Sequence, residues 1–276
     1  MELDLSKVSY SIRDLKRGII IPTIINEELA FLMGIHLGDG NLFYDPKKQQ
    51  YNINYTGHLT DEANWYSNFI TPLFFKMFHI QSYIYRDKRE NKNSIRILMK
   101  SKAIFTFFHS CLGLPSGKKD TCGVPNLIKN GSEDIKKAFL RGYVDTDFSL
   151  TFTRRKKEGL NKYPKICLST NNKQLAKDTV TLLQELGYTP YCRYNFYRPR
   201  YQQPHFSNEI NINGHEQLEK WIQEIGFSSP KHLTKYLIWK KYGFCPPYTT
   251  LKERETILLG DLLITDIPFR KNAKGL

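Results

Sequence analysis

A helix-like segment that ends on an acidic residue occurs twice in this chain, and this duplication limits the possible folds more than any other feature. Residues 31–43 read FLMGIHLGDGNLF, and residues 139–152 read FLRGYVDTDFSLTF. In both, an apolar run stops at a carboxylate, Asp39 or Asp147, and strand-like sequence follows. The two acids stand 108 residues apart in the sequence. A repeat of this length predicts two similar halves.

The order of the expected elements is similar in the two halves. In the first half we expect helices at residues 26–39, 61–78 and 102–113 and strands at 51–59, 82–87 and 94–100. In the second half we expect helices at 132–147, 173–187 and 216–226 and strands at 148–157, 162–170, 188–196 and 206–213. Each half is therefore close to α-β-β-α-β-β-α, and the predicted fold class is α+β with antiparallel sheets.

We expect one repeat to occupy residues 1–128 and the other residues 129–276. The second repeat alone continues into a basic helix at residues 231–243 and a tail. Two related α+β units suggest a pseudo-symmetric body whose sheets form a concave saddle, a shape that suits a DNA duplex.

Composition narrows the class of partner. The chain has 276 residues, a net charge of +14 and a pI of about 9.4, so a polyanion is expected, and nucleic acid fits better than a membrane. No apolar run approaches 18 residues, and no segment has the pattern of a signal peptide. The five cysteines form no CxxC pair, which argues against a zinc site and a disulfide framework. We therefore expect an intracellular protein, in the cytoplasm of a prokaryote or in an organelle.

Small residues one turn apart indicate how the two acid-ended helices pack. Gly34 and Gly38 lie on the first helix, and Gly142 and Thr146 take the matching places on the second. Such residues let two helix backbones approach closely. Face-to-face packing would bring both acids together at the C-terminal ends of the helices, where the helix dipole also disfavours negative charge. A bound divalent cation would relieve both effects.

The segments LMGIHLGDG (32–40) and LRGYVDTDF (140–148) resemble the two signature helices of the LAGLIDADG homing endonucleases. The order of elements fits that family over most of the chain. The resemblance implies a monomer that binds double-stranded DNA without an obligatory protein partner and cuts both strands within a long asymmetric site. It implies Mg²⁺ or Mn²⁺ as cofactor, with Ca²⁺ bound but not supporting cleavage.

The resemblance also implies which residues hold the metal. These are the carboxylates of Asp39 and Asp147, with the backbone carbonyls of Gly38 and Thr146 as further ligands. Asp145 matches the earlier acid of the motif, where the first half has Leu37. Phe148 replaces the usual closing glycine.

Family members place a lysine after the third helix of each half, near the reacting phosphate. The first half offers Lys118 and Lys119, and the second offers Lys231 and Lys235. Matching positions in the two halves favour Lys119 and Lys235 as the catalytic pair. Polar residues at the strand-to-helix junctions are further candidates, namely His58, Ser169 and Thr170.

The strands carry side chains of the types that contact phosphates and base edges. The predicted DNA-binding residues are Arg86, Lys88, Arg96, Lys100, Arg154, Arg155, Arg193, Asn195, Tyr197, Arg198, Arg200 and Gln203. A solvated sheet face explains any one of them, but it is a poor explanation for the whole set.

Two other functions remain open from the sequence. The chain could be an RNA maturase that binds its own intron RNA, or a regulator that binds nucleic acid without cutting it. A relative without cleavage activity would be expected to lose one of the acids. Both Asp39 and Asp147 are present, which favours the endonuclease.

Overall fold

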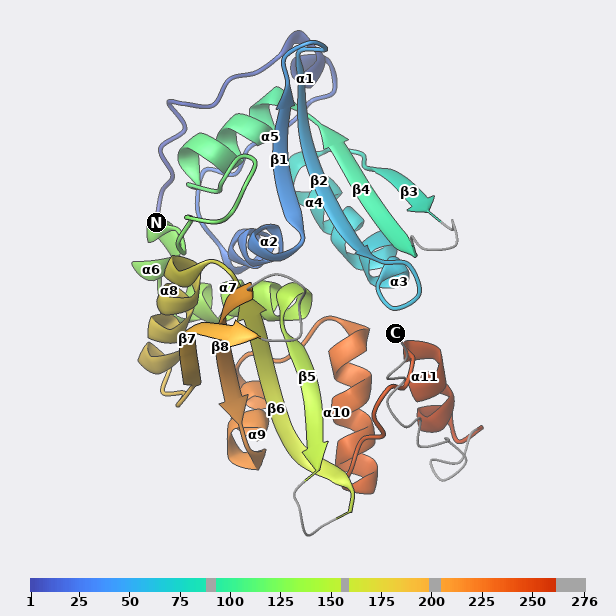
Figure 1. Cartoon of the computed structure of the whole chain (residues 1–276). Helices are drawn as coiled ribbons and strands as arrows, with labels where there is room; N and C mark the ends of the chain where they lie inside the picture. The colour runs from blue at the N-terminus through green and yellow to red at the C-terminus, as the bar shows by residue number, and fades with distance from the viewer. Residues whose placement is uncertain (88–92, 155–158, 199–204, 262–276) are drawn as a thin grey trace.

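Two helices that lie side by side form the centre of the molecule. The computed structural model describes residues 1–87, 93–154, 159–198 and 205–261. Helices α2 (Glu27–Gly38) and α7 (Glu133–Asp147) adjoin in the middle, with one sheet above them and one below in Figure 1. Each helix begins at a side-chain cap: Asn26 accepts from the N–H of Leu29, and Ser132 from that of Ile135.

The two sheets have the same topology. The first contains β1 (Gly40–Asp45), β2 (Gln50–His58), β3 (Tyr83–Asp87) and β4 (Ser94–Lys100) in the order β1-β2-β4-β3. The second contains β5 (Ser149–Arg154), β6 (Asn161–Thr170), β7 (Tyr191–Arg198) and β8 (His205–Asn213) in the order β5-β6-β8-β7. All pairs are antiparallel. The predicted α+β fold with two similar halves is confirmed.

Strand-like sequence was noted after Asp39, but no bounds were predicted for strand β1. The polar run at residues 44–50 suggested a loop, but only residues 46–49 form the turn between β1 and β2. Leu42 pairs with Ile53 across the two strands, and both side chains are fully buried. Alternation of buried and exposed residues over only a few positions was too short a signal to give the bounds of this strand.

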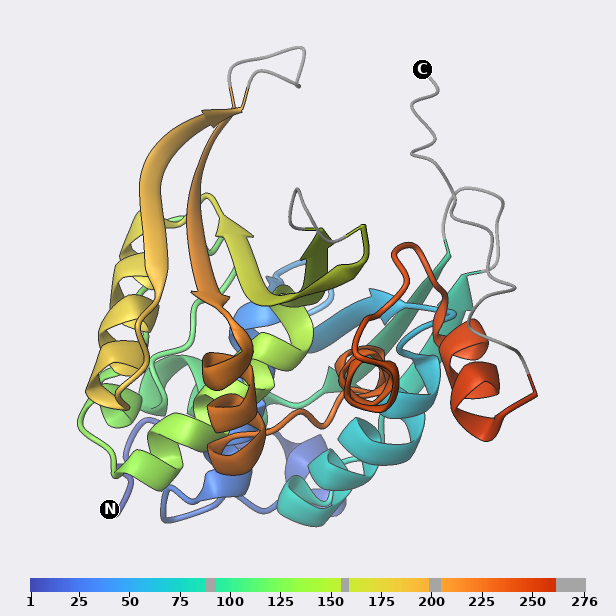
Figure 2. The ribbon, with the colours of Figure 1, turned by 90° about the horizontal axis from the view of Figure 1, so that it is seen from below.

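The remaining helices surround the sheets and the central helix pair. They are α1 (Ile12–Lys16), α3 (Ala63–Trp65), α4 (Thr71–Phe78), α5 (Lys102–Thr106), α6 (Asn126–Lys129), α8 (Lys173–Glu185), α9 (His215–Glu224), α10 (Pro230–Tyr242) and α11 (Leu251–Leu259), with π-helical turns at Tyr66–Ile70 and Phe107–Cys111. Figure 2 shows α4, α7 and α9 on the side opposite to the projecting hairpins β5–β6 and β7–β8.

A proline explains the irregular helix that follows β2. Pro72 lacks the N–H that a regular α-helix needs, and the chain forms a π-helical turn at Tyr66–Ile70 just before it. The Thr71 hydroxyl donates to the carbonyl of Tyr66 at 2.6 Å and so supplies a side-chain donor at this junction. The helical segment is thus divided at this proline into a π-helical turn and α4.

Each sheet has one buried face. In β2 and β4 the residues that point to the core are buried, namely Ile53, Tyr55, Ile95, Ile97 and Met99. They pack against helix residues of the first half such as Phe74, Phe78 and Phe108. The alternate residues, including Asn54, Thr56 and Arg96, therefore line the open face of the sheet.

The C-terminal part adds two helices to the second half. Helix α10 was predicted, but α11 was not, because the segment before it is rich in proline and polar residues. A capping box between Thr250 and Glu253 starts α11, and Arg254 on this helix is 1% exposed.

The predicted boundary between residues 128 and 129 falls in α6 and stays a prediction. In the described ranges no helix has the length and apolar character needed to cross a membrane.

Candidate active site

Glycine lets the backbones of α2 and α7 touch. A Cβ atom at Gly34 would lie 2.1 Å from the carbonyl oxygen of Phe139, and one at Gly142 would lie 2.1 Å from that of Phe31. Real Cβ atoms do not approach so closely, so each helix needs a residue without a side chain at this crossing. Two glycines inside helices cost about 1 kcal/mol each relative to alanine, and this close contact is the compensation.

One turn further on, the same packing brings the helix ends together. A Cβ atom at Gly38 would lie 2.0 Å from Oγ1 of Thr146 and 3.3 Å from Oδ1 of Asp147. Asp39 is the C-cap residue of α2, and Asp147 is the last residue of α7. The four predicted interface residues therefore all lie where the two helices touch, and the two acids stand at neighbouring helix ends.

Asp39 is held by a tyrosine of the first half. The Tyr66 hydroxyl donates to Oδ2 of Asp39 at 2.6 Å. Burial raises the pKa of Asp39 to about 7, with a further contribution from the negative charges of Glu62 and Asp147, whereas the Tyr66 hydrogen bond lowers it. The carboxyl group thus lies in a place where its negative charge is poorly compensated.

Asp147 lies at the C-terminal end of α7. Protein surrounds its carboxyl group on most sides, and one side is open to solvent. Desolvation raises its pKa to about 6, and the charges of Lys119 and Lys231 oppose this rise. A cation that enters from the open side would stabilise both carboxylates.

Lys119 caps the C-terminal end of α2. Its ammonium group donates to the carbonyls of His36 (2.9 Å), Leu37 (2.9 Å) and Gly38 (2.6 Å). A lysine at this position satisfies carbonyls that lack helical partners and complements the helix dipole. The side-chain amide of Asn172 fixes the loop through the carbonyl of Lys119 at 2.5 Å. This predicted site residue therefore lies beside the acid pair.

Lys231, rather than Lys235, takes the corresponding place in the second half. Its ammonium donates to the carbonyl of Thr146 at 3.0 Å and lies 2.5 Å from Oε1 of Glu62. Lys235 lies one turn further along α10 and donates to the carbonyl of Leu150 at 3.1 Å. Spacing along the sequence could not separate these two lysines, because both lie in the first two turns of one helix.

Asp145 is buried in a hydrogen-bond network near the interface between the two halves. It is fully buried, and its Oδ2 accepts from the N–H (2.9 Å) and the hydroxyl (2.6 Å) of Ser228. Burial raises the pKa of Asp145 to about 6, and the Ser228 hydrogen bonds oppose this. The indole N–H of Trp65 donates to the same hydroxyl at 3.3 Å, so this acid helps to tie the two halves together.

Two of the junction residues predicted to assist catalysis, His58 and Thr170, have hydrogen-bond partners other than the two acids. Nδ1 of His58 lies 2.8 Å from the hydroxyl of Thr60, and Thr170 accepts from the N–H of Asn172. Sequence reasoning missed Glu62 and Tyr66, which do reach the site. An acid directly before a helix looks like an ordinary cap, and Tyr66 lies in the irregular π-helical turn.

The open face of the first sheet carries some of the predicted DNA contacts. Arg96 is exposed, lies opposite Tyr85 in the sheet and places its guanidinium 4.9 Å from the centre of that ring. Lys100 points to the same face by alternation. Arg86 lies opposite Ile95 on the core-facing side, and it donates to the hydroxyl of Ser67 at 3.4 Å. The alternation in YNINYT also places Asn54 and Thr56 on the open face, and the prediction omitted both.

The second sheet also carries some of the predicted DNA contacts, and others lie outside the described residues. Arg193 is exposed, and its guanidinium lies 2.5 Å from Glu209 and 4.1 Å from the centre of the Phe196 ring. Asn195 has a positive φ of 50° in a strand irregularity. Arg154 and Tyr197 are exposed. Lys88, Arg155, Arg200, Gln203 and the side chain of Arg198 lie outside the described residues. Lys165 shares the face of Arg193, and the prediction omitted it.

The acid pair fits a divalent metal that completes its shell with other oxygens. Mg²⁺ is commonly bound by one or two carboxylates together with water and phosphate oxygens. The described ranges contain no group of three or more His, Cys, Asp or Glu side chains that could hold a metal. The carbonyls of Gly38 and Thr146, predicted as further ligands, accept hydrogen bonds from Lys119 and Lys231. The two carboxylates, in contrast, accept no lysine hydrogen bond among those described, and their role as metal ligands stays a prediction.

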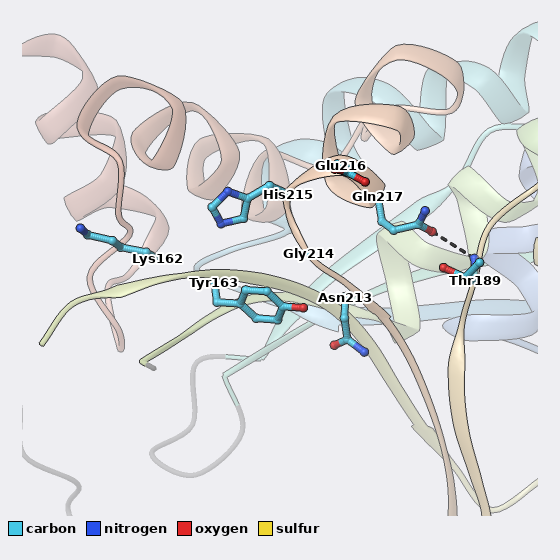
Figure 3. Close-up of a pocket in the computed structure, with 8 residues that line it drawn as sticks. All are labelled: Lys162, Tyr163, Thr189, Asn213, Gly214, His215, Glu216 and Gln217. Carbon is cyan, nitrogen blue, oxygen red and sulfur yellow. Dashed lines mark hydrogen bonds between the residues drawn. The ribbon is translucent and has the colours of Figure 1, made fainter. Parts of the chain in front are cut away.

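A separate pocket lies away from the acids. It has a volume of about 400 Å³ and is lined by Lys162, Tyr163, Thr189, Asn213, Gly214, His215, Glu216 and Gln217. Figure 3 shows it at the start of α9, where the Gln217 side chain accepts from the N–H of Thr189 at 3.1 Å. None of the predicted catalytic residues lines it.

Comparison with known proteins agrees with this fold. Residues 134–226 match the sequence pattern of the LAGLIDADG-like domain. The chain is 28% identical over 212 residues to the replication factor C small subunit of Methanocaldococcus jannaschii; the match covers 77% of this chain but only 10% of that protein. The chain thus spans about a tenth of the length of this curated relative.

Three solved structures are similar over most of the chain. A mesophilic variant of the homing endonuclease I-DmoI has a TM-score of 0.51 at 17% identity and covers 72% of this chain and 95% of its own. I-DmoI in complex with DNA and Mn has 0.50 at 18% identity, with 73% and 97% covered. A mutant of I-SmaMI has 0.52 at 12% identity, with 79% and 91% covered. At these identities the similarity concerns the fold, and it confirms the resemblance found in the two motifs.

Proposed function

Because the chain has the two-sheet fold of the LAGLIDADG homing endonucleases and a LAGLIDADG-like domain at residues 134–226, we propose that it is a DNA endonuclease. In this proposal it acts as a monomer, depends on a divalent metal and cuts both strands of duplex DNA at a long asymmetric site. The observation that carries the proposal is the meeting of Asp39 and Asp147 at adjoining helix ends, with a lysine beside each.

The open faces of the two sheets would bind the duplex. Both carry basic, amide and aromatic side chains, and both belong to the side from which the hairpins project in Figure 2. Arg96 and Lys165 would contact phosphates, which set the position of the DNA without reading its sequence. Asn54 and Thr56 have side chains able to form hydrogen bonds with base edges.

The residues around the two helix ends would act on a phosphate of each DNA strand. Asp39 and Asp147 would hold Mg²⁺ or Mn²⁺, which polarises the phosphate and lowers the pKa of bound water. Tyr66 orients Asp39 by its hydrogen bond. Lys119 and Lys231 would offset the negative charge that develops on the phosphate, and Ca²⁺ would bind without supporting cleavage.

A cleavage assay tests the proposal. Duplex DNA that spans the flanks of the chain's own gene is incubated with the protein and Mg²⁺, and double-strand breaks are scored. We expect Asp39→Asn and Asp147→Asn to abolish cleavage while metal-free DNA affinity stays within about twofold, since asparagine is similar in size but lacks the charge that holds the metal. Asp134→Asn, in the exposed first turn of α7, is the matched control.

Two results would count against the proposal. Double-strand cleavage retained in either acid variant would refute the assignment of the acids. Tight DNA binding by the parent protein without any cleavage would favour a non-cleaving regulator, and tight binding of its own intron RNA would favour a maturase.

A further inference from the structure

Two positive charges lie close together in the C-terminal part of the second half, on the buried Arg254 and the half-buried Lys235. Arg254 on α11 is 1% exposed, and its guanidinium donates to Oγ1 of Thr234 at 2.9 Å and to the carbonyl of Thr249. Lys235, next to Thr234 on α10, donates to the carbonyl of Leu150. Neither cation forms an ion pair with a carboxylate of the described residues. Neutral oxygens alone therefore face them at hydrogen-bond distance.

This arrangement is costly without an anion. A buried charge is normally paired, because desolvation is not repaid by neutral partners alone. Burial and the neighbouring charge of Arg254 lower the pKa of Lys235, and burial lowers that of Arg254. Asp61, which accepts from the N–H of Leu251 at 3.4 Å, acts on both cations only from a longer distance.

A pocket opens beside these cations. It has a volume of about 380 Å³ and lies between the free edge of β5 and the segment that joins α10 to α11. Its lining includes Leu150, Phe152, Lys235 and Thr249. Figure 2 shows this joining segment rising to the side of the molecule on which the hairpins project, which is the side proposed to bind DNA.

The edge of β5 supplies a further donor. At Leu150 both backbone groups point away from β6, since its N–H donates to Nδ1 of His232 and its carbonyl accepts from Lys235. In an antiparallel strand the same edge is reached by every second residue. The backbone N–H of Phe152 therefore faces this edge, in the lining of the pocket.

We propose that this pocket binds a phosphate group, which the Lys235 ammonium and the Phe152 N–H contact and which the charge of Arg254 attracts. A phosphate is small enough for the volume, accepts several hydrogen bonds and provides a negative charge that the described residues do not place against Lys235. It can come from the backbone of duplex DNA, which rests on the proposed function, or from free inorganic phosphate, which does not.

Thermal unfolding with inorganic phosphate tests the second source without DNA or metal. Against chloride at equal ionic strength, phosphate at saturating concentration should raise the Tm of the parent on the order of 2–4 °C. Lys235→Gln should remove this rise. Lys241→Gln is the matched control, because it removes one exposed charge from the last turn of the same helix and should leave the rise intact.

DNA binding tests the first source. The slope of log affinity against log salt should fall by about 1 in Lys235→Gln and stay unchanged in Lys241→Gln. If Lys235→Gln does not fold, acetylation of Lys235 in the parent protein, followed by mass spectrometry, should show protection by phosphate or by DNA.

The two sources give different outcomes. A Tm rise that depends on Lys235 shows binding of free phosphate, and a change of the salt slope that is specific to Lys235 shows binding of a backbone phosphate. The proposal is overturned if neither phosphate nor DNA has an effect specific to Lys235, or if Lys241→Gln changes the measurements equally. Because the phosphate experiment needs no cleavage, its failure would leave the endonuclease proposal untouched.

Discussion

The ammonium of Lys231 lies 2.5 Å from the carboxylate of Glu62, so a side chain of the second half is paired with one of the first half directly beside the two central acids. The side chain of Glu62 is 7% exposed and that of Lys231 is 18% exposed. Oε2 of Glu62 also accepts from the N–H of His58 at 2.7 Å. Glu62 thus fixes a lysine that caps α7, and the two halves share this contact.

A double-mutant cycle measures the strength of this pair. We expect Glu62→Gln and Lys231→Met each to lower the free energy of unfolding by about 1–3 kcal/mol, because each leaves a largely buried partner without its counter-charge. The double variant should lose less than the sum of the two, with a coupling of about 1 kcal/mol or more. Chemical denaturation gives all four values. Strict additivity would show that the pair does not link the halves.

The crossing of α2 and α7 predicts an unusual effect of alanine. On an exposed helix, replacing glycine with alanine stabilises by about 1 kcal/mol. At Gly34 the new methyl group would meet the backbone carbonyl of Phe139, which cannot rotate away. We therefore expect Gly34→Ala to lower the free energy of unfolding by about 1–3 kcal/mol.

Gly38→Ala provides the comparison for this experiment. Its methyl group would lie 2.0 Å from Oγ1 and 2.6 Å from Cβ of Thr146. A change of rotamer moves Oγ1 but not Cβ, so the clash remains and we expect a loss of stability comparable with that of Gly34→Ala. Equal or greater stability of Gly34→Ala relative to the parent would refute the close packing of the helices.

The sequence predicted the centre of the molecule better than its edges. Local signals were sufficient to predict the paired helices. These signals are the helical spacing, the caps Asn26 and Ser132, and the small residues Gly34 and Gly142. No bounds could be given for strand β1, because it is short, and helix α11 was missed, because it follows a stretch rich in proline and polar residues. Their positions depend on packing partners that are distant in sequence.

The residues around the acids were also harder to predict where their contacts are distant in sequence. Lys119 was identified by its place after the third helix of its half, but the choice between Lys231 and Lys235 depends on the direction of successive turns of α10. Glu62 reaches Lys231 across 169 residues of sequence. No local pattern contains such a contact, and it becomes visible only when the two halves are assembled.

The pKa values of the two acids predict how stability depends on pH in the metal-free protein. They are raised from 3.8 to about 7 for Asp39 and about 6 for Asp147. Between about pH 4 and pH 7 the folded protein therefore binds more protons at these sites than the unfolded chain, and their contribution to stability falls as the pH rises.

Asp39→Asn should remove part of this dependence. The quantity to compare is the free energy of unfolding of the variant minus that of the parent. This difference should increase between pH 4.5 and pH 7.5. Urea denaturation at a series of pH values, with a chelator present, measures it. The same difference for Asp134→Asn should stay nearly constant, because that residue is exposed. A flat difference for Asp39→Asn would mean that its carboxyl group titrates at an ordinary pKa.

The two faces of the first sheet give the last prediction, which concerns DNA binding. Arg96 points to the open face above Tyr85, whereas Arg86 lies opposite Ile95 and contacts Ser67 of the π-helical turn. Both are exposed arginines on neighbouring strands, so substitution removes the same charge from almost the same place. Only Arg96 is directed to the surface proposed to hold the duplex.

Affinity for duplex DNA should fall steeply with salt, because bound lysines and arginines displace counterions from the phosphates. Arg96→Gln should reduce the slope of log affinity against log salt by about 1, and Arg86→Gln should leave it nearly unchanged. Fluorescence anisotropy between about 50 and 200 mM salt measures both slopes. A reduction in Arg86→Gln that equals the one in Arg96→Gln would show that overall charge, and not the open face of the sheet, determines binding.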